Sequence, residues 1–297
     1  MVVITTKGNK SAEAFGLILP HEHIFVDLKQ WHEPGYAQAD VAEVIEFFGP
    51  VLQAAKAAGV TAIVECSPLG VGRRADIDKA VSEAHGLPII VPTGIYREPW
   101  IPDWAHDATE DALYEWMLKE LTEEIESSGV QAGWIKLSAG DAGMTDCEAK
   151  ILRAAARAGR ETGALIGSHT IKGRVVKDQL DMIEKAGYTA ERFLWIHTQA
   201  EKDLPLRLEI AGRGAWLEYD WIGGNDDDAY IRQIQVVVDA GYGDKLLLSH
   251  DQGWHDREKA DMFLHIPTVF VSKLRAAGLG ALVPQFTQTN PFNAFAR

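Results

Sequence analysis

The chain has 297 residues, of which 46% are hydrophobic and 24% charged, with a formal net charge of −14. This length suits two ordinary domains or one α/β barrel of about 250 residues, and the composition argues against disorder. The acidic balance, without a basic stripe, argues against a nucleic-acid partner. The two cysteines show neither zinc-ligand spacing nor a disulfide framework, and no apolar run has the length of a signal peptide or membrane span. We therefore expect a cytoplasmic protein without a membrane partner.

Short apolar segments and helix-patterned segments alternate along the chain. The strand candidates are residues 16–23, 61–67, 88–96, 132–140, 164–170, 193–198, 215–221 and 245–251. The clearest helix patterns between them cover residues 40–59, 111–129, 147–163, 175–187 and 230–241. Several of these close with Gly after the last apolar position, which is a typical helix stop.

This alternation predicts an α/β fold with a parallel sheet covered on both faces. Eight β/α alternations favour a (β/α)8 TIM barrel over an open doubly wound sheet, and no G-x-G-x-x-G follows the first strand. No linker divides the chain, so we expect one domain over residues 1–297. The less regular segment at about 252–285 is expected to form a capping loop at the barrel mouth.

Metal-competent side chains follow five of the eight expected strands. In a parallel barrel the carboxyl ends of the strands form the active site. These ends carry His21, His23, Lys136, His169, His197 and Asp251. Residues i and i+2 of a strand point the same way, so His21 and His23 can share a metal while Glu22 faces the other side. Four histidines and one aspartate exceed the ligands of a single catalytic ion, which favours two ions.

Lys136 stands where two metals would need an anionic bridge. An ammonium close to two cations is disfavoured, and a desolvated lysine loses its proton readily. A neutral amine can add CO2 and become a carbamate, which is a bridging carboxylate. From chemistry alone this remains a conjecture.

Six motifs resemble, in this order, the phosphotriesterase-like branch of the amidohydrolase superfamily, which includes the phosphotriesterase-like lactonases. They are LPHEH, PTGIY, GWIKLSAG, GSHT, WIHT and LSHD, and they span about residues 16–251. The resemblance implies a hydrolase, often a homodimer, with two divalent transition metal ions. The ions would be Zn2+, or Co2+, Mn2+, Fe2+ or Ni2+. It implies one ion on His21, His23 and Asp251, the other on His169 and His197, and a carboxylated Lys136 as the bridge.

The expected activity is hydrolysis of a carboxylic ester, in particular a lactone, with a small-molecule substrate. In this mechanism a metal-bridging hydroxide attacks the carbonyl and Asp251 takes up its proton. Phosphotriester hydrolysis and amide or N-acyl hydrolysis are alternatives for the same centre. A serine hydrolase is disfavoured because the chain has no G-x-S-x-G.

The substrate contacts are less clear. Lactonases of this branch carry a tyrosine where this chain has Tyr96, and the neighbouring Arg97 would meet an acidic substrate group or pair with Glu98. Lactonases also tend to show Asp-Arg-Tyr-Gly on strand 7, where we align Glu218 and Tyr219 of LEYDWIGG with the Asp and the Arg. The expected substrate-binding residues are Tyr96, Arg97, Tyr219 and Trp254.

The remaining polar residues receive structural interpretations. By strand alternation His250 should point away from the metals. Arg73 and Arg74 would face an anionic substrate or lie in a solvated loop, and we expect the loop. The histidines without a strand-end position are expected in surface or loop positions; they are His32, His85, His106, His255 and His265.

Overall fold

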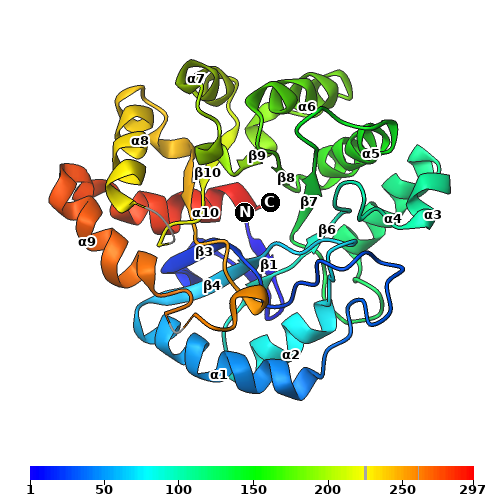
Figure 1. The fold of residues 1–297 in the computed structure, drawn as a ribbon, viewed down its shortest axis with the longest axis horizontal. Helices are drawn as coiled ribbons and strands as arrows, with labels where there is room; N and C mark the ends of the chain where they lie inside the picture. Colours follow the sequence, from blue (N-terminus) through cyan, green and yellow to red (C-terminus); the bar gives the residue numbers. More distant parts are fainter. Residues whose placement is uncertain (224–225, 260) are drawn as a thin grey trace.

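The computed structural model describes residues 1–223, 226–259 and 261–297. Within these residues a parallel β-barrel is surrounded by helices, viewed along its axis in Figure 1. Its strands are β3 (Leu17–Glu22), β4 (Val60–Glu65), β5 (Ile89–Ile90), β6 (Pro92–Thr93), β7 (Trp134–Ser138), β8 (Ile166–His169), β9 (Phe193–Ile196), β10 (Trp216–Tyr219) and β11 (Leu246–Leu248). Each expected strand segment coincides with one of these strands, although β4 begins one residue before its segment, and residues 88–96 contain two.

The strands follow one another around the barrel in chain order. One parallel sheet runs from β3 through β4 to β5, and the other from β6 to β11. β5 and β6 are separated by Val91 alone, so they are two halves of one strand position. The ring closes where Asp251 N, after β11, donates to the carbonyl of His21 in β3 at 3.1 Å. The predicted (β/α)8 TIM barrel is confirmed.

Helices cover the outside of the barrel (Figure 1). They are α1 (Val41–Ala57), α2 (Ala75–His85), α3 (Asp103–Asp107), α4 (Glu110–Thr122), α5 (Asp146–Thr162), α6 (Gly173–Lys185), α7 (Leu204–Gly212) and α8 (Asp227–Asp239). α1, α4, α5, α6 and α8 confirm the five patterned segments, although α4 ends at Thr122 instead of 129. α5 begins with a capping box of Thr145 and Glu148 and ends at Gly163, whose φ is 73°.

The hydrophobic core has two layers, one between strands and helices and one inside the barrel. Side chains along a strand alternate between these layers. Trp134 and Trp216 point into the barrel and Ile135 and Leu217 point toward the helices. This alternation determines which residues near the strand ends reach the barrel mouth.

The amino ends of the strands are closed by both chain termini. The hairpin of β1 (Val3–Thr5) and β2 (Gly8–Lys10) lies there with α10 (Asn290–Phe295). Val2 N donates to the carbonyl of Arg297 at 3.0 Å and Arg297 N to that of Val2 at 2.9 Å, and the ends lie together in Figure 1. With this end plugged, a ligand reaches the interior from the carboxyl ends of the strands.

The segment expected as a capping loop is irregular only in its first part. Residues 252–265 lack a long helix, and Ala260 lies outside the described residues. From Ile266 to Leu282 the chain is helical and includes α9 (Val271–Leu274), so this half of the expectation is wrong. Within the described ranges no single helix is long and apolar enough to cross a membrane; the bent pair Ile266–Leu282 and Gln285–Phe295 passes that test by length and composition.

Candidate metal centre

The first group of candidate ligands comes from the end of β3 and from the segment after β11. The register between β3 and β4 shifts between Leu19 and Glu22. Leu19 points toward the helices, yet His21, two residues later, lines the cavity at the barrel mouth. The irregular register therefore turns His21 inward, as bulges next to active sites commonly do.

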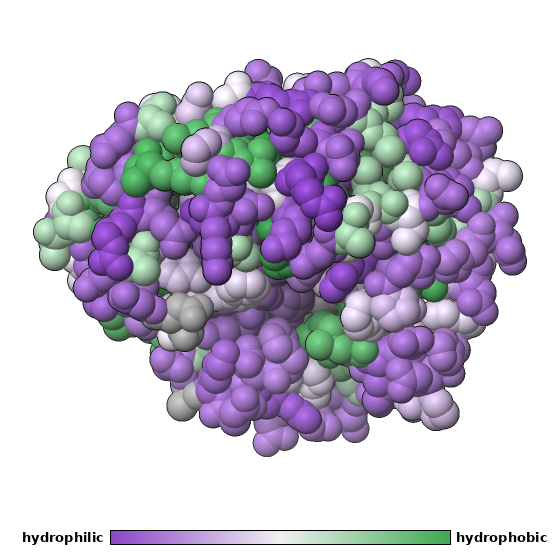
Figure 2. All heavy atoms as spheres, turned by 45° about the horizontal axis from the view of Figure 1, so that its top comes forward, coloured by the Kyte–Doolittle hydropathy of each residue, from purple (hydrophilic) through white to green (hydrophobic). Residues whose placement is uncertain are grey.

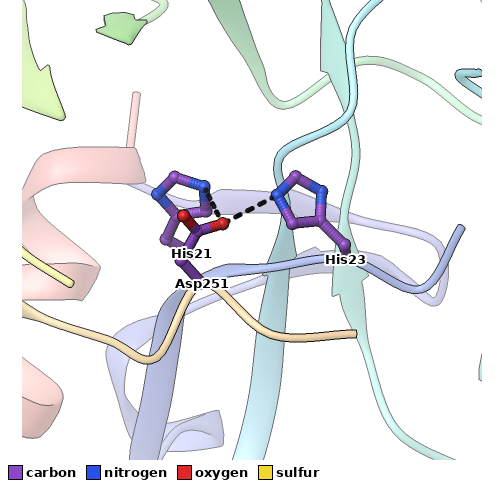
Figure 3. Close-up of side chains that lie close together, drawn as sticks. All are labelled: His21, His23 and Asp251. Carbon is purple, nitrogen blue, oxygen red and sulfur yellow. Dashed lines mark hydrogen bonds and ion pairs between the residues drawn. The ribbon is translucent and has the colours of Figure 1, made fainter. Parts of the chain in front are cut away.

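Asp251 joins His21 of β3 and His23, which directly follows this strand. Its Oδ1 lies 3.2 Å from His21 Nε2 and 3.1 Å from His23 Nε2. Figure 3 shows the carboxylate between the two imidazole rings. These three residues each offer one ligand atom, all within 4.8 Å of one another. Two nitrogens and one carboxylate oxygen suit a divalent transition metal ion.

The second group consists of His169 at the end of β8 and His197 directly after β9. His169 Nδ1 and His197 Nε2 lie 2.7 Å apart, and the ring of His197 lies 5.5 Å from that of His21. The two groups therefore share one cavity.

Lys136 lies between these groups at the level of β7. It points inward like Trp134, is only 2% exposed and lines the same cavity. Among the described residues its side chain has no hydrogen bond or direct ion pair, and the ammonium lies 5.9 Å from the centre of the Trp134 ring. A buried ammonium without a counter-charge is costly. The structure therefore leaves this amine without the partner that a charged lysine needs.

Each candidate ligand histidine except His169 has a partner on its other ring nitrogen. Glu218 Oε2 lies 3.0 Å from His21 Nδ1, and Asp220 Oδ1 lies 2.7 Å from His197 Nδ1. Ser67 Oγ lies 2.8 Å from His23 Nδ1. Such partners fix the ring orientation and tautomer of metal-binding histidines. They leave Nε2 of all three rings available to a metal.

Burial and neighbouring charges determine the protonation states in this cavity. Burial, and next the positive charge of His197, hold the pKa of His169 well below its ordinary value. Burial opposes ionisation of Asp251, but the surrounding histidines hold its pKa well below the ordinary range. Burial also opposes protonation of His21, yet the negative groups around it raise its pKa well above 6.5. A neutral His169 and an anionic Asp251 are the forms that bind metal.

The cavity has a volume of about 180 Å3 and lies at the carboxyl ends of the strands. Its lining residues are His21, His23, Val26, Leu28, Cys66, Val71, Tyr96, Lys136, His169, His197, Trp221, Asp251 and His255. All six expected metal ligands are among them. Figure 2 shows a mostly hydrophilic face with a central hollow beside a small hydrophobic patch.

Trp221 is a cavity residue that the sequence analysis did not identify. Its ring stacks on His197 at 4.9 Å, and its indole N–H donates to Asp251 Oδ2 at 2.8 Å. Trp221, His197 and Asp251 all have positive φ, at 61°, 67° and 56°. Such backbone conformations are costly for bulky residues and concentrate at functional sites.

The expected substrate contact at Tyr219 is corrected. Trp216 and Glu218 point into the barrel, so alternation sends Tyr219 toward the helices. There it is fully buried, and its hydroxyl lies 3.4 Å from Arg207. The residues of LEYDWIGG that reach the site are instead Glu218, behind His21, Asp220, behind His197, and Trp221; Gly224 of this run lies outside the described residues.

The other three expected substrate contacts differ in position. Tyr96 lines the cavity, with its ring 5.4 Å from that of His169. Arg97 follows it and lies over the ring of Trp100 at 5.7 Å. Trp254 is not a lining residue; it packs against Phe25 at 5.9 Å and Phe47 at 5.5 Å.

Two further polar interpretations can be compared with the structure. His250 points away from the cavity as expected: its Nδ1 lies 2.6 Å from Glu22 Oε1, and its Nε2 accepts from Ile266 N at 3.0 Å. Arg73 does not lie in a solvated loop, since it is 4% exposed and makes a two-pronged contact with Glu120.

The histidines expected in surface or loop positions are not all remote from the site. His255 is exposed in the irregular segment after β11, as expected, but it also lines the cavity, with its ring 5.4 Å from that of His23. His85 Nε2 contacts the carbonyl of Ile45, and His265 pairs with Asp227.

The barrel and its ligand cluster define a hydrolase of the (β/α)8 class, and comparison with known proteins identifies its family. The phosphotriesterase family matches residues 1–294, and the chain belongs to it. A phosphotriesterase homology protein of Mycobacterium tuberculosis is 28% identical over 263 residues, 83% of this chain and 79% of that protein. An aryldialkylphosphatase of Saccharolobus solfataricus is 25% identical, over 84% of this chain and 81% of that protein. An N-acetyltaurine hydrolase of Mus musculus is 26% identical, over 75% of this chain and 69% of that protein.

Solved structures agree with this assignment. A mutant organophosphorus hydrolase from Deinococcus radiodurans is 31% identical, with a TM-score of 0.88 over 100% of this chain and 98% of that one. A mutant phosphotriesterase-like lactonase from the same organism is 30% identical, with a TM-score of 0.88 over 99% of this chain and 100% of that one.

Proposed function

We propose that the chain is a binuclear metal-dependent hydrolase that cleaves a carboxylic ester, in particular a lactone. The observation that carries this proposal is the convergence of two nitrogen pairs, one carboxylate and one unpaired lysine in a single cavity. Its overall class follows from the family to which the chain belongs.

The donor atoms fit two divalent ions. His21, His23 and Asp251 would hold one, and His169 and His197 the other. A carboxylated Lys136 would supply an oxygen to each, which removes the cost of its unpaired charge. When bound, such a pair of ions polarises a carbonyl and lowers the pKa of water. Zn2+, Co2+, Mn2+, Fe2+ and Ni2+ all accept this mixture of ligands.

The protein's own groups have separable roles in this proposal. Asp251 is anionic, so it can accept a proton and return it to the leaving oxygen. The Trp221 indole, donating to Asp251 Oδ2, fixes the orientation of that carboxylate. Tyr96 and Trp221 lie on either side of the histidines and would hold the acyl part of the substrate.

The size of the cavity favours a lactone over a phosphotriester. At about 180 Å3 it is smaller than typical small-molecule pockets of roughly 300–1,000 Å3. A flat lactone ring fits such a space better than a phosphorus atom carrying three ester groups. Names of similar proteins include both a lactonase and an organophosphorus hydrolase. The N-acetyltaurine hydrolase among the relatives supports amide hydrolysis as a second candidate.

The test combines metal analysis with a substrate panel. Protein produced with added Zn2+, Co2+ or Mn2+ should contain about two ions per chain, lose activity on chelation and recover it when metal returns. Lactones should be hydrolysed faster than N-acyl amino acids, and paraoxon slowest. Well under one ion per chain after metal-supplemented growth contradicts the binuclear centre, and a faster N-acyl reaction replaces the lactone proposal by the amide.

A further inference from the structure

Arg97 lacks a counter-ion although the chain carries 43 acidic residues against 29 lysines and arginines. Glu98, its neighbour in sequence, lies 3.6 Å from His106 instead. The two oxygens of Glu148 accept the backbone N–H groups of Glu98 and Thr145. Across the described parts of the chain, no hydrogen bond or ion pair connects the Arg97 guanidinium to another residue, and its Nε is buried without a partner.

The position of Arg97 connects it to the metal cavity. It directly follows Tyr96, whose ring packs against both His169 and Trp100. The guanidinium lies over Trp100, and the Trp100 indole donates to the carbonyl of Leu28 at 2.8 Å. Leu28 is itself a lining residue of the cavity. The positive charge of Arg97 also contributes to the low pKa of His169. Arg97 is not itself a lining residue, but it lies next to the cavity, beside the lining residue Tyr96 and against Trp100.

A half-buried guanidinium whose Nε is buried without a hydrogen-bond partner is energetically unfavourable. Buried polar groups nearly always have hydrogen-bond partners, and guanidinium groups bind carboxylates through two parallel N–H···O bonds. Trp100 holds the guanidinium by a cation–π contact, which limits the entropy lost when an anion binds. The site is complete only with an added negative group.

We propose that Arg97 binds a carboxylate group of the substrate. The inference rests on the proposed hydrolase function, which it narrows to compact acyl compounds that carry one negative charge away from the scissile bond. One unpaired cation balances one negative charge, and the cavity of about 180 Å3 leaves room for only a short spacer.

Equilibrium binding tests this proposal without turnover. N-acetylglycine and N-acetylglycinamide differ only in the carboxylate, and calorimetry on metal-free and metal-loaded protein compares them. The wild type should bind the carboxylate about 10- to 100-fold more tightly, as expected for a hydrogen-bonded charge pair. Arg97→Gln should reduce this ratio to near one, and Arg97→Lys should keep part of it because the charge remains without the planar fork.

A matched control removes the same charge elsewhere. Arg275 is exposed and outside the cavity lining, so Arg275→Gln should keep the wild-type ratio. A wild-type ratio near one overturns the proposal. A ratio that survives in Arg97→Gln also overturns it, because the carboxylate then binds the metals or another group. If the ratio behaves as expected while neither compound nor any lactone is hydrolysed, the carboxylate site stands and the proposed function fails.

Discussion

Lys136 is fully enclosed by the barrel yet has no polar partner among the described residues. If it carries the bridging carbamate, Lys136→Ala should abolish activity and reduce bound metal to about one ion per chain or less. A short carboxylate such as acetate, added with metal, should restore part of the activity by occupying the same space. Metal analysis and lactone hydrolysis measure both effects. An exposed lysine, as in Lys7→Ala, should change neither, and unchanged metal content in Lys136→Ala would falsify the bridging role.

Asp220 holds His197 from behind, at 2.7 Å from Nδ1. Asp220→Asn keeps the shape but weakens the charge-assisted hydrogen bond, so metal affinity or activity should fall by about 10- to 100-fold. Competition with a chromophoric chelator measures the affinity. Asp181→Asn, on an exposed part of α6, serves as the control. A wild-type affinity in Asp220→Asn would show that the ring needs no such support.

At the level of single residues, the sequence analysis predicted the six candidate metal ligands but missed most of the residues that surround them. Ligands follow strands, so a strand pattern is enough to find them. Glu218 and Asp220 act through ring nitrogens, and nothing in the spacing of LEYDWIGG shows which residue meets which histidine. Alternation from Trp216 was available, however, and it would have excluded Tyr219. The proximity of His255 depends on the path of an irregular loop and has no sequence signal.

Between the elements, one buried ion pair joins the loop before α2 to α4. Arg73 contacts both oxygens of Glu120 at 2.6 and 2.9 Å, and Thr93 donates to the same carboxylate at 2.6 Å. Arg73→Met leaves Glu120 charged and buried, so the free energy of unfolding should fall by about 3–5 kcal/mol.

Urea denaturation measures this loss. Arg74 pairs with the half-exposed Asp76 next door, so Arg74→Met should cost no more than about 1 kcal/mol. Equal losses in the two variants would mean that burial of the Arg73 pair is not the reason for its importance.

The strands and five helices were predictable because their apolar positions repeat with a clear period. α2 and α7 were not predicted. α2 carries charged residues between its apolar positions, and α7 is a nine-residue helix that begins with Leu204 and Pro205. The helical stretch from Ile266 onward was taken for a loop, since it is broken into short turns of different type.

For the whole molecule, metal binding and pH should be coupled. The pKa values of His21 and His23 lie above 6.5 in the metal-free protein, because the negative groups around them outweigh burial; the largest of these contributions come from Cys66 for His21 and from Asp251 for His23. Protons therefore compete with metal up to and above neutral pH, and the affinity should rise steeply from about pH 6 to pH 8.

A rise in pH changes the stability of the metal-free protein and that of the metal-loaded protein in opposite directions. In the metal-free protein, these two histidines stabilise the fold below pH 6.5, and this contribution is lost as pH rises through their folded pKa. Bound metal raises the free energy of unfolding by about 2.7 kcal/mol when the metal concentration is a hundred times Kd. The difference in Tm between loaded and chelated protein should thus grow with pH, as scanning calorimetry can measure. A difference that shrinks with pH would contradict this.

The homodimer and small-molecule substrate implied by the family resemblance stay predictions. Light scattering should give twice the mass of the chain. A single-chain mass at micromolar concentration would contradict the dimer.

The contact from Glu22 through His250 to Ile266 has a consequence for motion. Glu22 lies between His21 and His23 in the sequence, and the Ile266 amide, 16 residues after His250, donates to the His250 imidazole. The backbone N–H of Ile266 can exchange with solvent only when this connection opens. Its deuterium uptake would therefore report, from the outer helical layer, how long the metal cavity stays assembled.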